Sequence, residues 1–223
     1  MKFMNFLRGN VVGGAVINSS CITINGKSVS SQKTEQVSKV LSGLAPFEKL
    51  EVTGPFNVEW SGAVDTEVVL HAEEHVLDLM EVHSRGGVLV VSAKSGSFAC
   101  NVMPTVVVRS PQVTSARVKG SGDISLQGLK QARFTAEVVG SGDIQAVGTV
   151  DALEVQVQGS GDFKGRKLQA ATATLAVMGS GDIDVSVLGD VYARVMGSGD
   201  ITVYGCRGQR NASVMGSGDI SFE

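Results

Sequence analysis

One tetrapeptide, Gly-Ser-Gly-Asp, recurs six times in the second half of the chain and is followed each time by Ile or Phe. Successive copies of its aspartate are 20, 19, 20, 18 and 19 residues apart. Helical repeats need about 33 residues or more and propeller blades about 40 or more, so this period is too short for either architecture. It suits one coil of a β-solenoid, and it predicts an all-β fold with about 19 residues per coil.

Within each repeat, apolar residues alternate with other residues, which is the pattern of a β-strand with one buried face. The parity of Val177 and Ile183 places both glycines of the fourth tetrapeptide on the inward side, and its serine and aspartate on the outward side. Glycine is expected where the backbone approaches the core or bends around a corner. We therefore predict a structural role for the repeat glycines: Gly120, Gly122, Gly140, Gly142, Gly159, Gly161, Gly179, Gly181, Gly197, Gly199, Gly216 and Gly218.

Coils stacked in register about 4.8 Å apart align equivalent residues into rows. One outward row consists of the repeat aspartates: Asp123, Asp143, Asp162, Asp182, Asp200 and Asp219. Neighbouring carboxylates about 5 Å apart in water repel by about 0.8 kcal/mol, whereas one hydrogen bond to a charged group contributes about 1.5 to 3 kcal/mol. Backbone N–H groups or serine hydroxyls can thus hold the row, and we predict no metal ion in it. Binding of a ligand or a row of cations is the alternative, although the calcium-binding solenoid repeat has nine residues and a different Gly–Asp spacing.

A second outward row precedes the first glycine of each tetrapeptide: Lys119, Val139, Gln158, Met178, Met196 and Met215. Its three methionines predict a small apolar strip. We expect the strip to pack beneath the N-terminal segment or a loop, and partner binding is the alternative.

Residues 45–223 are predicted to form one domain, with the repeats over 116–223, and residues 1–44 an N-terminal extension. Ahead of the repeats, four stretches predict strands, at 49–52, 56–60, 67–71 and 87–93, with turn-forming residues between them. Residues 95–98 look like a repeat that has lost its aspartate. We expect a strand over 21–26 that ends in an Asn-Gly hairpin turn, and a linker or short helix over 27–43.

Four segments, in this order, carry a resemblance to a known family: Phe47-Glu48-Lys49-Leu50-Glu51-Val52-Thr53-Gly54-Pro55-Phe56-Asn57-Val58-Glu59, Leu77-Asp78, Gly87-Val88-Leu89-Val90-Val91 and the Gly-Ser-Gly-Asp array. Together they resemble the bacterial domain called putative auto-transporter adhesin, head GIN domain, over about 180 of the 223 residues. The resemblance implies a right-handed parallel β-helix-like solenoid and adhesion at the cell surface, to an unknown surface glycan or protein. It supplies no catalytic residues.

The repetition also argues against an enzyme, because an active site is one asymmetric place and six near-identical copies indicate architecture. We therefore predict a non-enzymatic binding or structural domain that presents Ser and Asp rows and uses no cofactor. The alternative is a hydrolase or lyase acting on polysaccharides, since carboxylates about 5 Å apart approach the separation in retaining glycosidases. Aromatic platforms for sugars are few: Trp60, Tyr192, Tyr204 and eight Phe.

The three histidines lie within 13 residues: His71, His75 and His83. The helical zinc motif requires Glu directly after the first His, but Ala72 stands there, so we expect a solvated connection rather than a metal site. The three cysteines, Cys21, Cys100 and Cys206, have neither metal-ligand nor disulfide-framework spacing.

Nucleic-acid binding is excluded as a function class by the net charge of −3 and the lack of a long basic run. No stretch approaches 18 uninterrupted apolar residues, so no transmembrane helix is predicted. Lys2 and Arg8 precede a short apolar run and Cys21, which weakly suggests a lipoprotein signal, but polar Asn18 disfavours it. Without a clear signal peptide the sequence by itself indicates the cytoplasm, whereas the resemblance implies the cell envelope or surface.

Open solenoid ends expose unpaired strand groups, which invite stacking unless they are covered. Residues 11–43 are long enough to cover one end. We therefore expect a monomer or a weak end-to-end oligomer.

Overall fold

The computed structural model describes residues 36–94, 100 and 102–223, together with the backbone of four short strands nearer the N-terminus. Those strands form an antiparallel sheet in chain order: β1 (Asn10–Val12), β2 (Ala15–Asn18), β3 (Cys21–Ile24) and β4 (Lys27–Ser28). The strand expected over 21–26 is thus present as β3. The expected Asn-Gly turn at 25–26 and the degenerate repeat at 95–98 lie outside the described residues.

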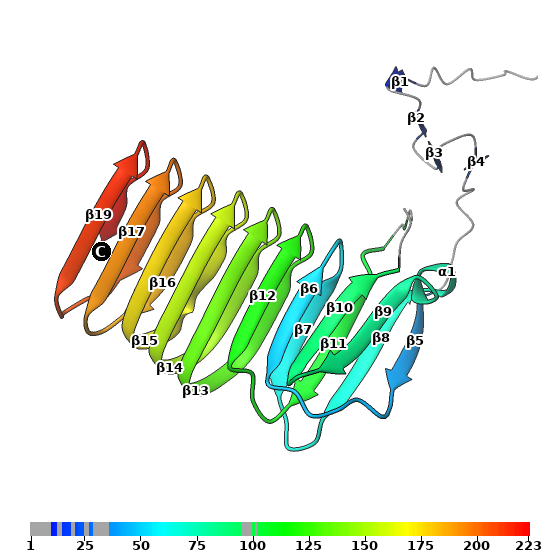
Figure 1. Cartoon of the computed structure of the whole chain (residues 1–223), viewed down its shortest axis with the longest axis horizontal. Coiled ribbons are helices and arrows are strands. Elements are labelled where there is room, and N and C mark those ends of the chain that lie inside the picture. Colours follow the sequence, from blue (N-terminus) through cyan, green and yellow to red (C-terminus); the bar gives the residue numbers. More distant parts are fainter. Residues whose placement is uncertain are drawn as a thin grey trace, which may run out of the picture.

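The repeats form a β-solenoid in which each coil lies parallel to the next (Figure 1), as predicted. We call face A the strands that precede each tetrapeptide: β6 (Lys49–Thr53), β12 (Ser115–Gly120), the second halves of β13 (Ile124–Gly140), β14 (Ile144–Gly159) and β15 (Phe163–Gly179), then β17 (Val191–Gly197) and β19 (Arg210–Gly216). Face B comprises the strands that follow it: β7 (Asn57–Gly62), the first halves of β13, β14 and β15, β16 (Ile183–Val187), β18 (Ile201–Tyr204) and β20 (Ile220–Phe222). The tetrapeptide is the corner between the two faces.

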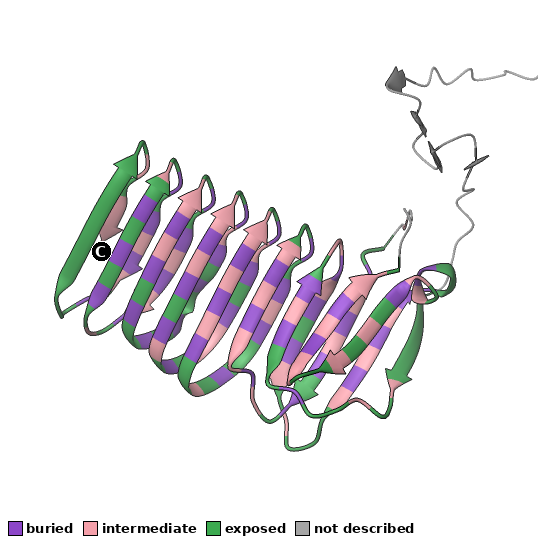
Figure 2. Cartoon of the chain, viewed as in Figure 1, coloured by how far each residue is buried: buried purple, intermediate pink, exposed green. Residues whose placement is uncertain are grey.

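The core lies between the two faces and consists of one apolar rung per coil. On face A, Val138, Val157 and Val177 stack in register with their side chains fully enclosed. Ile144, Phe163 and Ile183 do the same on face B. Figure 2 shows the resulting alternation of buried and exposed residues along each strand. Burial of one Val or Ile side chain stabilises the fold by about 1.5 to 3 kcal/mol. The alternation of apolar residues along each strand therefore determines which side of the strand faces the core.

Five strands outside the repeats extend the two faces and end them: β5 (Gln36–Leu41), β8 (Glu67–Glu73), β9 (Met80–Arg85), β10 (Val88–Ala93) and β11 (Thr105–Ser110). β10 continues face A beside β6, and β9 pairs antiparallel with it. β11 continues face B beside β7, and is followed by antiparallel β8 and then β5. Strands therefore occupy all four stretches in which the sequence predicted them.

The linker or short helix expected over 27–43 is wrong for residues 27–28, which form β4, and for residues 36–41, which form β5. The sequence of β5 does not alternate cleanly between apolar and polar residues, and five of its six residues are exposed. They are a strand because β8 has a free edge there, to which β5 pairs from Gln36 opposite Glu73 to Leu41 opposite Val68. The one helix of the described residues, α1 (Glu74–Leu77), joins β8 to β9 and buries Val76 at the same end of the solenoid.

The tetrapeptide glycines lie where successive coils come closest. A Cβ atom on Gly181 would stand 2.0 Å from the carbonyl oxygen of Gly161 in the preceding coil, and 3.0 Å from Cγ1 of Val157. Gly179 has a φ of +151°, and its Cβ would stand 2.2 Å from the carbonyl oxygen of Gly159. The constraint on these positions therefore comes mainly from the neighbouring backbone, which cannot move aside as a core side chain can.

We expect Gly181→Ala to destabilise the domain by about 3 kcal/mol, the upper end of the usual cost of overpacking, because the obstructing atom belongs to the backbone. Gly62→Ala is the control, since a Cβ there meets only Trp60 at 3.8 Å, an ordinary contact. Thermal unfolding of both variants measures the difference. A Gly181→Ala protein that melts like the parent would show that the corner has room for a side chain.

Candidate functional site

The repeat aspartates form one row along the corner where face B begins. From the second to the sixth, the backbone N–H of each aspartate donates to Oδ1 of the aspartate one coil earlier, at 2.7 to 3.0 Å. Every aspartate but the last thus accepts a hydrogen bond from the next coil. A charge-assisted bond of this kind is comparable to, or stronger than, the repulsion of about 0.8 kcal/mol from each neighbouring carboxylate.

The row begins one coil earlier than the sequence indicated, at Asn57. Oδ1 of Asn57 accepts the N–H of Asp123 at 3.2 Å. Gly54 lies beside Gly120, and Val58 pairs with Ile124. The segment Gly54-Pro55-Phe56-Asn57 is therefore a degenerate tetrapeptide, and the glycine three residues before a short Asx side chain was the signal that sequence reasoning missed.

A lysine lies over the middle of the row. Nζ of Lys164 hydrogen-bonds to Oδ2 of Asp143 and lies 3.7 Å from Oδ2 of Asp162. The hydrogen bond to Asp143 raises the pKa of Lys164; burial opposes this rise, and the charges of the nearby aspartates add to it. Because the pKa of Lys164 is raised, the lysine contributes stability at neutral pH, and the contribution is lost as the pH rises through that pKa. The lysine side chain is 50% exposed, so the contribution is at most about 1 kcal/mol.

Metal ligation finds no support in the arrangement of the described residues, where no group of three or more His, Cys, Asp or Glu side chains is placed to hold an ion. The histidines separate: His71 Nδ1 lies 2.8 Å from the Ser38 hydroxyl, and His75 Nδ1 lies 3.6 Å from a carboxylate oxygen of buried Glu73. Sequence reasoning placed Glu73 in a solvated connection, which is wrong because the end of β8 turns this side chain inward.

Both cysteines of the described residues are free thiols. Burial, followed by the charge of Glu73, raises the pKa of Cys100, which disfavours the reactive thiolate. Cys206 is buried, with its sulfur 3.2 Å from the carbonyl oxygen of Gly189.

Face A divides into a charged and an apolar half. Near the N-terminal end, Arg117 and Lys119 pair with Glu51 and Glu137 across neighbouring strands, at 2.8 to 3.8 Å.

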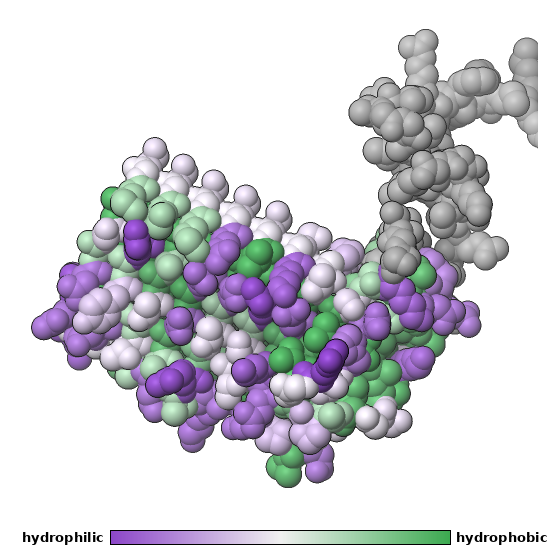
Figure 3. All heavy atoms as spheres, in the orientation of Figure 1, coloured by the Kyte–Doolittle hydropathy of each residue, from purple (hydrophilic) through white to green (hydrophobic). Residues whose placement is uncertain are grey.

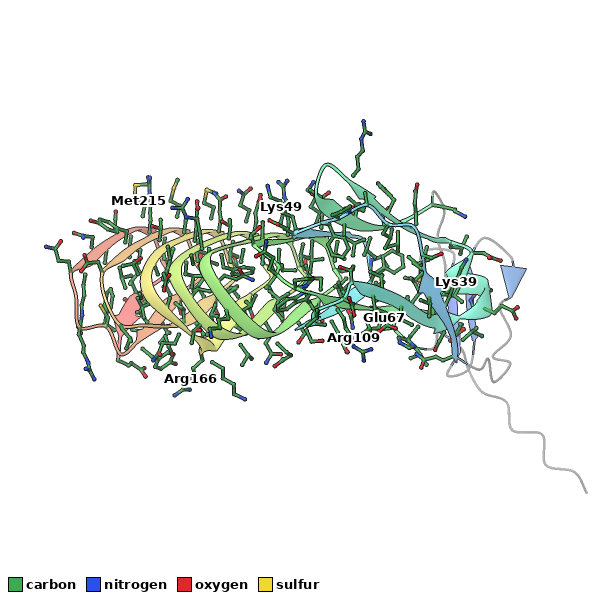
Figure 4. All side chains as sticks on the ribbon, turned by 90° about the horizontal axis from the view of Figure 1, so that it is seen from below. Lys39, Lys49, Glu67, Arg109, Arg166 and Met215 are labelled. Carbon is green, nitrogen blue, oxygen red and sulfur yellow. The ribbon has the colours of Figure 1, made fainter. Side chains whose placement is uncertain are left out.

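Toward the other end of face A, Met178, Met196 and Met215 stand in register on three adjacent strands. Figure 3 shows a pale green band beneath the pale glycine and serine ridge in this half, and Figure 4 shows Met215 and Lys49 on the same side of the solenoid, opposite Arg166. Met196 and Met215 are 40% and 50% exposed, so no loop of the described residues covers them. The expected packing beneath the N-terminal segment lies outside the described residues.

A groove crosses the lower part of face A beside Tyr192, and sequence reasoning did not find it. It measures about 350 Å³ and has polar and charged walls: Arg133, Glu154, Thr172, Thr174, Asp190 and Tyr192. These residues are separated by up to 59 positions in the sequence (192 minus 133) and meet only because their strands stack in register.

Residues 46–206 match the family model described as "Putative auto-transporter adhesin, head GIN domain". The chain belongs to this family. The resemblance noted in its sequence is thereby confirmed. No curated protein matches the chain.

Solved structures share the fold of this head GIN domain at low sequence identity. A putative adhesin from Bacteroides fragilis superposes with a TM-score of 0.68 at 19% identity, over 85% of this chain and 97% of that one. A putative adhesin from Parabacteroides distasonis gives 0.56 at 16% identity, over 85% and 98%. A protein from the same species, described as a putative lipid binding protein, gives 0.51 at 18% identity, over 84% and 96%. At these identities the likeness is one of fold.

The described residues contain no helix of the length and apolar character needed to cross a bilayer.

The hydrogen bonds of the aspartate row lead to a graded prediction for Asp182. Asp182→Asn keeps the Oδ1 acceptor for the N–H of Asp200 and should leave the melting temperature nearly unchanged. Asp182→Ala removes that acceptor and should cost about 1 kcal/mol, which lowers the melting temperature by about 2 to 4 °C in a domain of this size.

Calcium at millimolar concentration should leave both the parent and Asp182→Asn unchanged. A cation bound to the folded state at about 1,000 times its dissociation constant would add about 4 kcal/mol. A large rise in melting temperature with calcium that disappears in Asp182→Asn would show a cation row instead.

Proposed function

We propose that this head GIN domain is a non-catalytic binding or structural domain of the cell envelope or surface, which uses its regular faces to contact a surface glycan or protein. The family description, an adhesin head, supports the binding role and the location. The observation that carries the proposal is that the most reactive side chains of the repeats, the aspartates, share one repeated environment.

Acid–base catalysis requires two titratable groups whose surroundings drive their pKa values apart. Along the row, Oδ1 of each inner aspartate accepts the backbone N–H of the next aspartate. Its own backbone N–H donates to Oδ1 of the aspartate before it. Only Lys164 makes one inner aspartate differ from the others, because it pairs with Asp143. This pairing occupies the carboxylate instead of freeing it for acid–base catalysis. The row is thus suited to holding coils together and presenting a regular charged edge.

The alternative, a polysaccharide hydrolase or lyase, sets the test. Purified protein should release no reducing ends from neutral or acidic polysaccharides and form no unsaturated sugar detectable by ultraviolet absorbance. Asp182→Asn is assayed in parallel and should be equally inactive. Turnover by the parent that this single substitution abolishes would refute the proposal.

We also propose that the domain is a monomer or associates weakly through its ends. At the N-terminal end, β5 pairs with the outer edge of β8, and α1 connects β8 of face B to β9 of face A and buries Val76. At the other end of the described residues, all of β19 is exposed, and Val214 is 42% exposed whereas its counterpart Val195 is enclosed. Covering an edge strand is one way in which natural sheets avoid pairing with other chains.

Removal of residues 1–41 should expose the edge of β8 and raise the apparent mass measured by light scattering. Removal of residues 1–35 leaves β5 in place and is the matched control, so it should behave like the full chain. If the shorter protein stays at the mass of the control, β5 does not protect that edge.

A further inference from the structure

Tyr192 breaks the pattern of its row on face A. In register across the face, its counterparts are charged or small polar residues: Lys49, Ser115, Thr135, Glu154, Thr174 and Asn211. The coil needs no aromatic ring there, because the position points away from the core. Yet the residue is a tyrosine that is 54% exposed. One exposed ring does not by itself indicate a binding site, so the surface around Tyr192 decides what the ring can do.

The ring stands between two hollows. On one side lies the groove of about 350 Å³, and on the other lies a hollow of about 390 Å³ bordered by Arg210, Asn211 and Ser213. Small-molecule sites usually occupy about 300 to 1,000 Å³ and combine apolar surface with a few polar groups. Ala152, Leu153 and Ala173 also line the groove, and the last two are almost fully buried, so apolar side chains lie at its floor.

The groove runs across the strands rather than along them. Its residues come from β13, β14, β15 and β17 or from the turn just before β17, which are successive coils of face A. Three steps of about 4.8 Å give a length of about 14 Å. This extent suits a short chain of linked rings better than a single small metabolite.

The polar groups at the rim offer both donors and acceptors. Within the described residues, the side chains of Arg133 and Glu154 make no hydrogen bond or ion pair, so their hydrogen-bonding groups are available. Asp190 uses Oδ1 to accept the N–H of Gln209 at 2.8 Å, which leaves its other oxygen. One positive and two negative side chains create no field of a single sign, and this mixture favours an uncharged ligand over an acidic polymer.

The backbone under the groove is already used. The second half of β15 pairs along its length with β14 on one side and β17 on the other, so an extended peptide cannot add itself as another strand there. The ligand must be recognised through side chains alone, by one aromatic surface and several hydrogen-bonding groups. A pyranose ring fits both requirements, because it has an apolar C–H face and a rim of hydroxyls.

We propose that this groove binds an uncharged oligosaccharide, in which one sugar ring stacks on Tyr192 and the neighbouring hydroxyls hydrogen-bond to Arg133, Glu154 and Asp190. The inference rests on the proposed binding function and gives it a ligand class and a place on face A.

The test is a titration of the isotopically labelled full chain with uncharged hexasaccharides, namely cellohexaose, maltohexaose and chitohexaose, at millimolar concentration and followed by NMR. At least one of them should shift the signals of residues around Tyr192. Tyr192→Ala should weaken that binding at least about tenfold, whereas Tyr192→Phe keeps the ring and should bind within a few fold of the parent. Glu154→Gln, which alters one hydrogen-bonding group at the rim, should weaken binding less than Tyr192→Ala.

Tyr204→Ala is the matched control, because this tyrosine lies on face B, where Arg166 stacks over it at 4.3 Å. It should bind like the parent. The inference is overturned if none of the three sugars binds, or if Tyr192→Ala, with its melting temperature unchanged, binds as well as the parent. Binding elsewhere on the surface would overturn this inference but leave the proposed function standing. Cleavage of the hexasaccharide would refute the proposed function itself.

Discussion

The close stacking of backbones at the Gly-Ser-Gly-Asp corner is the constraint on which the rest of the structure depends. The carbonyl oxygen of Gly140 accepts two N–H groups of the next coil, from Ser160 at 2.8 Å and from Gly161 at 3.0 Å, and the same pair of bonds recurs at later corners. A side chain on the first glycine of the next tetrapeptide, Gly159, would stand 2.3 Å from that same oxygen. The corner therefore requires glycine, and once it is formed it sets the register of both faces.

The coils differ in length by up to two residues, and the chain absorbs these differences away from the tetrapeptide. Register shifts occur between Gln127 and Leu129 and between Gln145 and Val147, toward the turn at the far side of each coil. Face A and the aspartate row continue without a break past these irregularities. Differences in coil length are thus confined to the far side of each coil, and the hydrogen bonds of the corner restore the register once per coil.

A framework held by its corners and its core leaves the outward positions of each strand free to vary. Face A uses this freedom in two ways: ion pairs around Arg117 cover one half, and methionines with Tyr192 occupy the other. The repeated elements account for the architecture and for the regular faces, and a departure from repetition on face A adds the groove for which we propose a ligand. Tyr192 is such a departure, and it cannot be explained by packing.

The sequence by itself determined the class of fold, the strands of the repeats and the inward side of each strand. These properties are local, because the period, the parity of apolar residues and the glycines lie within single coils. Asn57, β5 and the groove at Tyr192 required the tertiary structure. The place of Asn57 in the aspartate row is shown by the N–H of Asp123 that it accepts, since a glycine three residues before an Asx side chain is too common a pattern to show it alone. β5 is a strand only because β8 offers an edge. Arg133 and Asp190 meet because hydrogen bonds between coils fix which residues of distant segments become neighbours, and no pattern within one segment carries that register.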